Sequence, residues 1–103
     1  MSMRALVLAA ILTAGWVGAP AIADDAMPPL GAQCLSCHGS DGRPALADLP
    51  IIAGQQPLYL ANALKAYRDG KRAAGQAMVM HEIVKNTTDA EIEALAQWFG
   101  GQQ

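Results

Sequence analysis

The feature that most constrains this chain is a pair of cysteines three residues apart, followed at once by a histidine, in the run Cys34-Leu35-Ser36-Cys37-His38. These are both of the cysteines among the 103 residues. A disulfide between them would close so short a loop that it would remove little entropy from the unfolded chain. The two thiols and the imidazole therefore indicate a different kind of crosslink.

Three kinds of site use cysteines at this spacing. A thioredoxin-like redox pair belongs to a βαβ pattern, which this sequence lacks. A four-ligand zinc site needs further Cys or His residues, and His81 alone remains. Cys-x-x-Cys-His is typical of covalent haem attachment, because two thiols one helical turn apart can add to the vinyl groups on one porphyrin edge. We therefore predict one covalent haem c on Cys34 and Cys37, with His38 as an iron ligand.

The first 23 residues have the pattern of a secretory signal peptide. Arg4 precedes an apolar run over residues 5–12, and the small-x-small site Ala21-Ile22-Ala23 stands just before Asp24. Small and polar residues interrupt the apolar run, so it falls short of the roughly 20 apolar residues that a membrane span needs. We expect cleavage after Ala23 and export to the periplasm.

Residues 24–103 would then form one mature domain of 80 residues. Domains of this size gain only about 3–5 kcal/mol from apolar burial and need a staple, which a covalent haem would supply. Without Arg4, six basic residues face nine acidic ones, a net charge of −3. This acidity argues against a nucleic-acid partner. No segment after residue 23 is apolar enough to predict a membrane span.

The rest of the chain predicts an all-α domain of about three helices. A short first helix should begin at Pro29 and run into the cysteines. A second should begin at Pro57 and stop at Asp69-Gly70, with apolar positions at the helical repeat Leu60, Ala63, Leu64 and Tyr67. The last should begin after a capping box at Thr88 and present the stripe Ile92, Leu95, Ala96 and Phe99. Residues 71–87 predict a loop.

The second axial ligand of the iron has three candidates in that loop. Methionine paired with histidine is usual in c-type cytochromes, and imidazole is also a haem ligand, so Met78, Met80 and His81 all qualify. A methionine is often core filler, but these two stand in a polar stretch. If that stretch is extended, residues two apart point the same way. Spacing alone then does not choose between Met78 and Met80.

Four stretches of the mature chain carry a family resemblance: residues 34–39, 49–54, 59–72, and 79–85 together with 88–92. Through them the chain resembles the class I c-type cytochromes along nearly its whole mature length. Among these it looks most like the short, single-haem subunits of bacterial flavocytochrome c sulfide dehydrogenases. The resemblance implies a class I cytochrome c fold around one covalent haem, although the first helix is shorter than in such relatives.

The resemblance also implies roles for individual residues. The ligand methionine of such proteins lies a short fixed distance before the capped last helix, which lands on Met80. The proline twelve residues after the ligand histidine is Pro50, whose carbonyl is expected to accept the second N–H of His38. Tyr59 is expected to line the haem edge, with core packing as the alternative.

The resemblance implies electron transfer and not catalysis, since an iron with both axial positions filled has no open site for a substrate. The expected role is haem subunit or acceptor of a periplasmic flavoprotein dehydrogenase such as sulfide dehydrogenase, passing electrons to a downstream acceptor. One alternative is a free soluble shuttle to a terminal oxidase or reductase. Another is a haem enzyme or gas sensor, if Met80 does not bind. Small apolar residues beside Met80 could contact a partner protein, with packing on the haem alone as the alternative: Ala73, Ala74, Ala77 and Val79.

Overall fold

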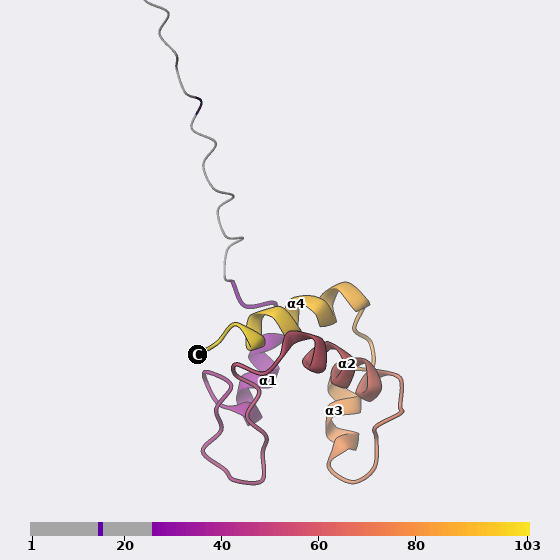
Figure 1. The fold of residues 1–103 in the computed structure, drawn as a ribbon. Coiled ribbons are helices and arrows are strands. Elements are labelled where there is room, and N and C mark those ends of the chain that lie inside the picture. Colours follow the sequence, from indigo (N-terminus) through magenta and orange to yellow (C-terminus); the bar gives the residue numbers. More distant parts are fainter. Residues whose placement is uncertain (1–14, 16–25) are drawn as a thin grey trace, which may run out of the picture.

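The computed structural model describes Gly15 and residues 26–103, and this part of the chain contains four α-helices and no strand (Figure 1). The helices are α1 (Gly31–His38), α2 (Pro57–Arg68), α3 (Ala77–Val84) and α4 (Asp89–Gly100). The predicted signal peptide, residues 1–23, lies outside the described residues except for Gly15. None of the described helices is both long and apolar enough to cross a bilayer. The all-α prediction is confirmed.

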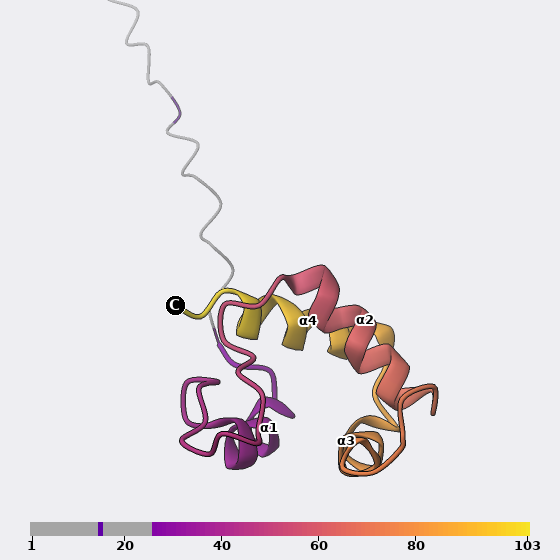
Figure 2. The same cartoon turned by 60° about the horizontal axis from the view of Figure 1, so that its bottom comes forward.

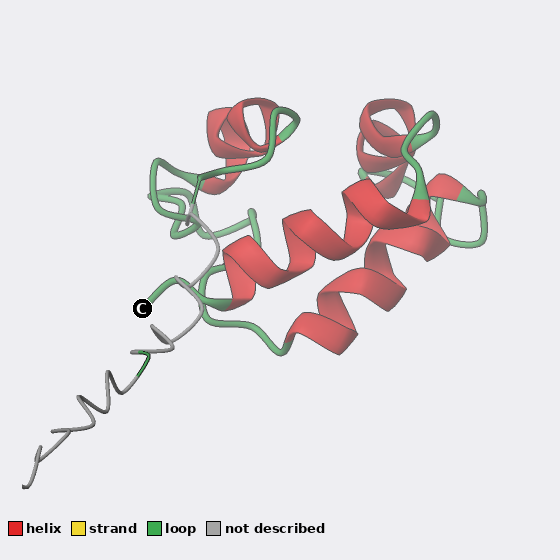
Figure 3. Cartoon of the chain, turned by 90° about the horizontal axis from the view of Figure 1, so that it is seen from above, coloured by secondary structure: helices red, strands yellow, loops and turns green. Residues whose placement is uncertain are grey.

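The two longest helices, α2 and α4, lie side by side (Figure 3), and α3 also packs on α2. Figures 1 and 2 show α1 and α3 at opposite ends of this pair, on the same side of it. The long loop of residues 39–56 leads from α1 to the start of α2. The fold is therefore a two-helix platform with one short helix at each end.

The prediction for α4 is confirmed in its start and in its buried face. Thr88 Oγ1 accepts a hydrogen bond from the Glu91 N–H at 3.1 Å, which satisfies one of the unpaired donors in the first helical turn. The predicted apolar stripe is buried throughout: Ile92, Leu95, Ala96 and Phe99. This stripe is the centre of the core, so α4 is the helix around which the platform is built.

Helix α2 begins at Pro57 as predicted, and its apolar positions divide between two surfaces. Leu60 and Ala61 are buried in the core cluster with α4. Ala63, Leu64 and Tyr67 remain partly exposed, although they belong to the predicted stripe. The part of the α2 stripe formed by Ala63, Leu64 and Tyr67 is thus apolar but not fully covered by protein.

Helix α1 begins at Gly31, two residues later than predicted. The Gly31 N–H donates to the Pro28 carbonyl at 2.8 Å, so Pro28 and Pro29 form a turn before the helix. Leu30 and Trp98 pack against the core cluster that contains Cys34 and Leu95. This contact holds the short first helix against the end of α4.

The prediction that residues 71–87 form a loop is wrong for residues 77–84, which form α3. Ala and Met are good helix formers, but the usual sequence signals for a helix start are missing. The N-cap residue is Gln76, whose side chain makes no capping hydrogen bond. The helix has only eight residues, too short for a stable isolated helix, so its packing on α2 decides its conformation.

Candidate functional site

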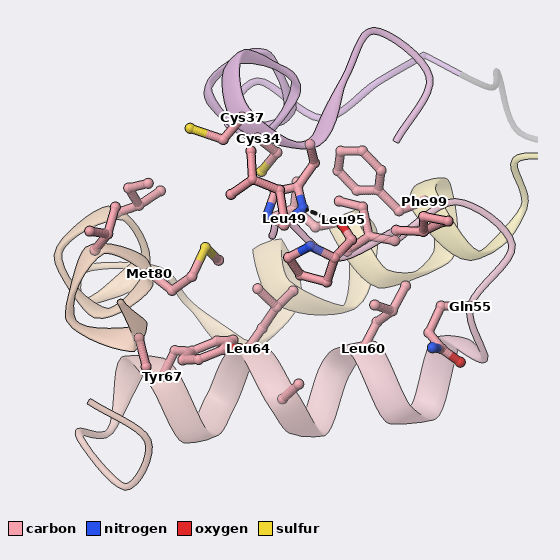
Figure 4. Close-up of a pocket in the computed structure, with 18 of the residues that line it drawn as sticks. Cys34, Cys37, Leu49, Gln55, Leu60, Leu64, Tyr67, Met80, Leu95 and Phe99 are labelled. Carbon is pink, nitrogen blue, oxygen red and sulfur yellow. Dashed lines mark hydrogen bonds between the residues drawn. The ribbon is translucent and has the colours of Figure 1, made fainter. Parts of the chain in front are cut away.

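The uncovered apolar face of α2 forms one wall of a cavity, with α1 and α3 on either side (Figure 4). The cavity has a volume of about 570 Å³, within the roughly 300–1,000 Å³ of pockets that hold cofactors and small molecules. Most of its lining is apolar, including Leu49, Leu60, Leu64, Tyr67, Leu95 and Phe99. Such walls are unfavourable against water, so the cavity suits a large apolar ligand.

Both cysteines of the sequence motif line this cavity from α1 (Figure 4). Cys34 is buried and Cys37 is exposed, so one thiol lies in the wall and the other at the rim. Burial raises the pKa of the Cys34 thiol, since the apolar surroundings disfavour the thiolate. The two thiols are placed, as predicted from their spacing, one helical turn apart on one side of a large apolar cavity.

His38, the last residue of α1, is buried and also lines the cavity. Its Nδ1 lies 2.8 Å from the carbonyl oxygen of Pro50, in the loop that follows. Because a carbonyl only accepts, Nδ1 carries the proton, and in the neutral ring Nε2 then keeps a free lone pair. The hydrogen bond that the resemblance implied is therefore present, and it leaves the nitrogen that could bind iron available.

Gly39 allows the chain to leave the helix directly after His38. Its φ is 87°, a conformation that side-chain-bearing residues rarely adopt. A Cβ at this position would also collide with the carbonyl of Arg43. The glycine thus permits the tight return of the loop that brings Pro50 back to the His38 ring.

The helical conformation of α3 separates the two methionines that an extended strand would have placed on one side. Residues two apart in a helix point about 200° apart. Met80 lines the cavity and extends toward its middle (Figure 4), whereas Met78 is not among the lining residues and is 46% exposed. His81 is also outside the lining, and its Nδ1 lies 2.6 Å from the carbonyl of Tyr67.

Tyr59 lines the cavity near the start of α2 and is 52% exposed. Its exposure places it at the rim and not in the packed core. Pro50 contributes to the lining as well as to the hydrogen bond with His38. All six site residues predicted from the sequence thus border one cavity.

The sequence did not single out Tyr67 or Arg72 as site residues, and both line the cavity. The guanidinium carbon of Arg72 lies 4.7 Å from the centre of the Tyr67 ring. Tyr67 belongs to an apolar helical repeat, and a repeat that lines a cavity has the same period as one that faces a core. A guanidinium at the edge of an apolar cavity suits a carboxylate, and haem carries two propionate carboxylates.

The residues at this cavity fit a covalently held haem. Two thiols stand at one side, an imidazole offers Nε2, and a thioether approaches from α3. Imidazole and thioether together are an axial pair found in c-type cytochromes. Most of the remaining lining is apolar, as the faces of a porphyrin require.

Comparison with known proteins agrees with this fit. The family model for cytochrome c matches residues 18–100 of the chain. Cytochrome c-554(548) of Halomonas halodenitrificans is 36% identical over 70 residues, which cover 68% of this chain and 84% of that protein. The cytochrome subunit of sulfide dehydrogenase of Chlorobaculum tepidum is 35% identical over 71 residues, covering 69% of this chain and 61% of that protein.

A third relative is much longer than this chain. The thiosulfate dehydrogenase electron acceptor of Thiomonas intermedia is 33% identical over 69 residues, which cover 67% of this chain but 32% of that protein. The matched part thus makes up about a third of one relative and less than two thirds of another. The similarity concerns the haem domain, and partners of the longer proteins do not transfer with it.

Proposed function

This chain belongs to the cytochrome c family, and from that premise we propose that it is an exported electron carrier that accepts single electrons from a periplasmic flavoprotein dehydrogenase. The domain carries covalent haem c, for which Cys34, Cys37 and His38 are the attachment motif. When bound, the haem supplies a one-electron couple between ferric and ferrous iron.

The observation that carries this proposal is the placement of two different iron-binding side chains around one cavity. His38 comes from α1 and Met80 from α3, and these helices lie at opposite ends of the platform (Figure 2). With the plane of a porphyrin between them, the two side chains would fill both axial positions. No position would then remain for a substrate or a gas, which favours electron transfer over catalysis and sensing.

The chain's own residues would support this role in three ways. The Pro50 carbonyl accepts a hydrogen bond from the Nδ1–H of His38 and so fixes the orientation and the tautomer of the ring. The apolar walls exclude water, and a dry environment around the iron shifts its reduction potential. The Met80 thioether would favour ferrous iron and raise that potential.

The proposed electron donor is a flavoprotein that oxidises sulfide. Two relatives are a cytochrome subunit of sulfide dehydrogenase and an electron acceptor of thiosulfate dehydrogenase, so both work with a sulfur-oxidising dehydrogenase. By family resemblance, residues 79–85 are more similar to haem subunits of sulfide dehydrogenases than to free shuttles, and this resemblance motivates sulfide as the proposed source of the electrons. A free shuttle to a terminal oxidase or reductase is the second candidate, supported by the relative that is a small cytochrome in its own right.

The rim of the cavity offers a surface for such a donor. Ile51, Tyr59 and Val79 line the cavity and are exposed by 60, 52 and 57%. Apolar side chains at the edge of a redox site can pack against a partner while the haem edge stays within reach. Ala74 is exposed beside this rim, whereas Ala73 and Ala77 are partly covered.

The test mixes the purified, haem-loaded cytochrome with the sulfide-oxidising flavoprotein of its own host, adds sulfide without oxygen, and follows haem reduction. We expect reduction much faster than with sulfide and cytochrome alone. A rate no faster than that background would remove the flavoprotein proposal and leave a general shuttle. Thiosulfate dehydrogenase with thiosulfate is the parallel arm, and faster reduction there would reassign the donor.

A matched pair of variants locates the contact. Val79→Ser changes an exposed apolar side chain at the rim, and Leu46→Ser changes one that is 63% exposed and is not part of the cavity lining. We expect Val79→Ser to slow reduction by the flavoprotein several-fold and Leu46→Ser to leave the rate within twofold of wild type. Equal effects of the two changes would argue against docking at the rim.

A further inference from the structure

Helix α3 carries Met80 and has little stability of its own. It has eight residues, and its N-terminal residue has no side-chain cap. An isolated helix of this length is unstable in water, so α3 depends on its packing against α2. What fixes the rotation of α3 on α2 therefore also fixes the direction of the Met80 side chain.

His81, the next residue along, bonds α3 to α2. Its Nδ1 lies 2.6 Å from the backbone carbonyl of Tyr67. That carbonyl also accepts the Gly70 N–H at 3.2 Å and belongs to the last turn of α2, where carbonyls lack helical partners. Within the described part of the chain, this is the one side-chain hydrogen bond that joins α3 to α2.

The two side chains stand in a fixed relation because they are neighbours on one helix. Successive helical residues point about 100° apart, so when His81 faces the end of α2, Met80 faces the cavity. Tyr67 takes part in both arrangements: its backbone carbonyl accepts the hydrogen bond from His81, and its side chain lines the cavity that Met80 enters (Figure 4). The hydrogen bond thus limits the rotation of α3 on α2, and this rotation sets how far the Met80 sulfur extends into the cavity.

We propose that His81 is a positioning residue, which holds the Met80 thioether toward the haem iron through its hydrogen bond to the Tyr67 carbonyl. The inference rests on the proposed axial role of Met80. His81 would act through the hydrogen bond that its Nδ1 donates, and not through a change of charge on the ring. Without the bond, α3 would turn or lift more often, and the bond from sulfur to iron would open more often.

The experiment measures how readily imidazole displaces the thioether from the ferric, haem-loaded protein, followed by loss of the thioether-to-iron absorption band. The net free energy of one protein hydrogen bond changes an equilibrium constant by a factor of roughly three to ten. We therefore expect His81→Ala to lower the imidazole concentration needed for half-displacement about three- to tenfold.

Two further variants separate positioning from general destabilisation. The Asn side-chain amide can place an N–H donor where Nδ1 stands, so His81→Asn should return imidazole affinity to within about twofold of wild type. Glu82→Ala removes the exposed ion pair between this α3 residue and Lys85, the residue after the helix (2.7 Å), and it should leave imidazole affinity unchanged. Denaturant unfolding of each variant checks whether the effect follows global stability.

The outcomes are distinct. Unchanged imidazole affinity in His81→Ala overturns the inference, and so does a His81→Asn variant that behaves like His81→Ala. Loss of the wild-type spectrum in both His81 variants would make His81 itself the ligand, which also overturns it. A wild-type protein without the thioether band would instead refute the axial role of Met80, so the two failures are distinguishable.

Discussion

Replacing Met80 by alanine is expected to abolish the thioether-to-iron absorption band of the ferric protein and to let carbon monoxide bind the ferrous iron. Met80 extends into the cavity from α3, and alanine cannot reach its middle (Figure 4). The iron would be left with His38 and an open position. Since axial ligands set haem potentials over a range of about 0.8 V, losing the thioether should lower the potential by on the order of 0.1 V or more.

Met78→Ala is the matched control, because it removes the same side chain two residues away from a position that is 46% exposed and outside the cavity lining. It should keep the absorption band, exclude carbon monoxide and shift the potential little. If Met78→Ala alone removed the band, the register of α3 would be wrong. If neither change mattered, His81 would become the candidate ligand.

The Cys34→Ala, Cys37→Ala double variant is expected to remain largely unfolded, with little helical circular dichroism. Without covalent attachment, the chain would have to keep a cavity of about 570 Å³ lined by apolar side chains. Domains of this size gain only about 3–5 kcal/mol from apolar burial, so little net stability would remain with these side chains against water.

The control for this variant is Ser36→Ala, which lies between the two cysteines on an exposed position and only bonds within its own helix. It should fold and bind haem like wild type. Denaturing mass spectrometry should find wild type as residues 24–103 plus one haem, retained on the peptide with Cys34 and Cys37. A double variant that folds without haem, or wild-type haem released by acid and solvent, would contradict covalent stapling.

The features of the fold and the site that the sequence predicts well are those for which a short local motif is compatible with only one structure. Cys-x-x-Cys-His has a spacing that few other sites use. Thr88 starts α4 through a cap that the structure retains, and the apolar stripe that follows is buried. Pro57 at the start of α2 is similarly unambiguous. These features need no information from distant residues.

The parts that sequence left open depend on tertiary packing. α3 has no capping signal, so no local feature of the sequence distinguishes it from a loop. In an extended backbone, the Met78 and Met80 side chains would point to the same side. The helix distinguishes the two methionines because the helical repeat places their side chains on different faces of α3. Likewise Tyr67 follows a repeat that fits a core, and only the position of α2 beside the cavity shows that it lines the site.

With both axial positions of the haem iron filled by side chains, the proposed role of this chain is electron transfer alone. The most direct measurement is the absorption spectrum of the reduced wild-type protein with and without carbon monoxide at neutral pH. Carbon monoxide should leave the spectrum unchanged, because His38 and Met80 would occupy both axial positions. A spectrum that shifts at once on adding carbon monoxide would contradict it and indicate a haem enzyme or gas sensor.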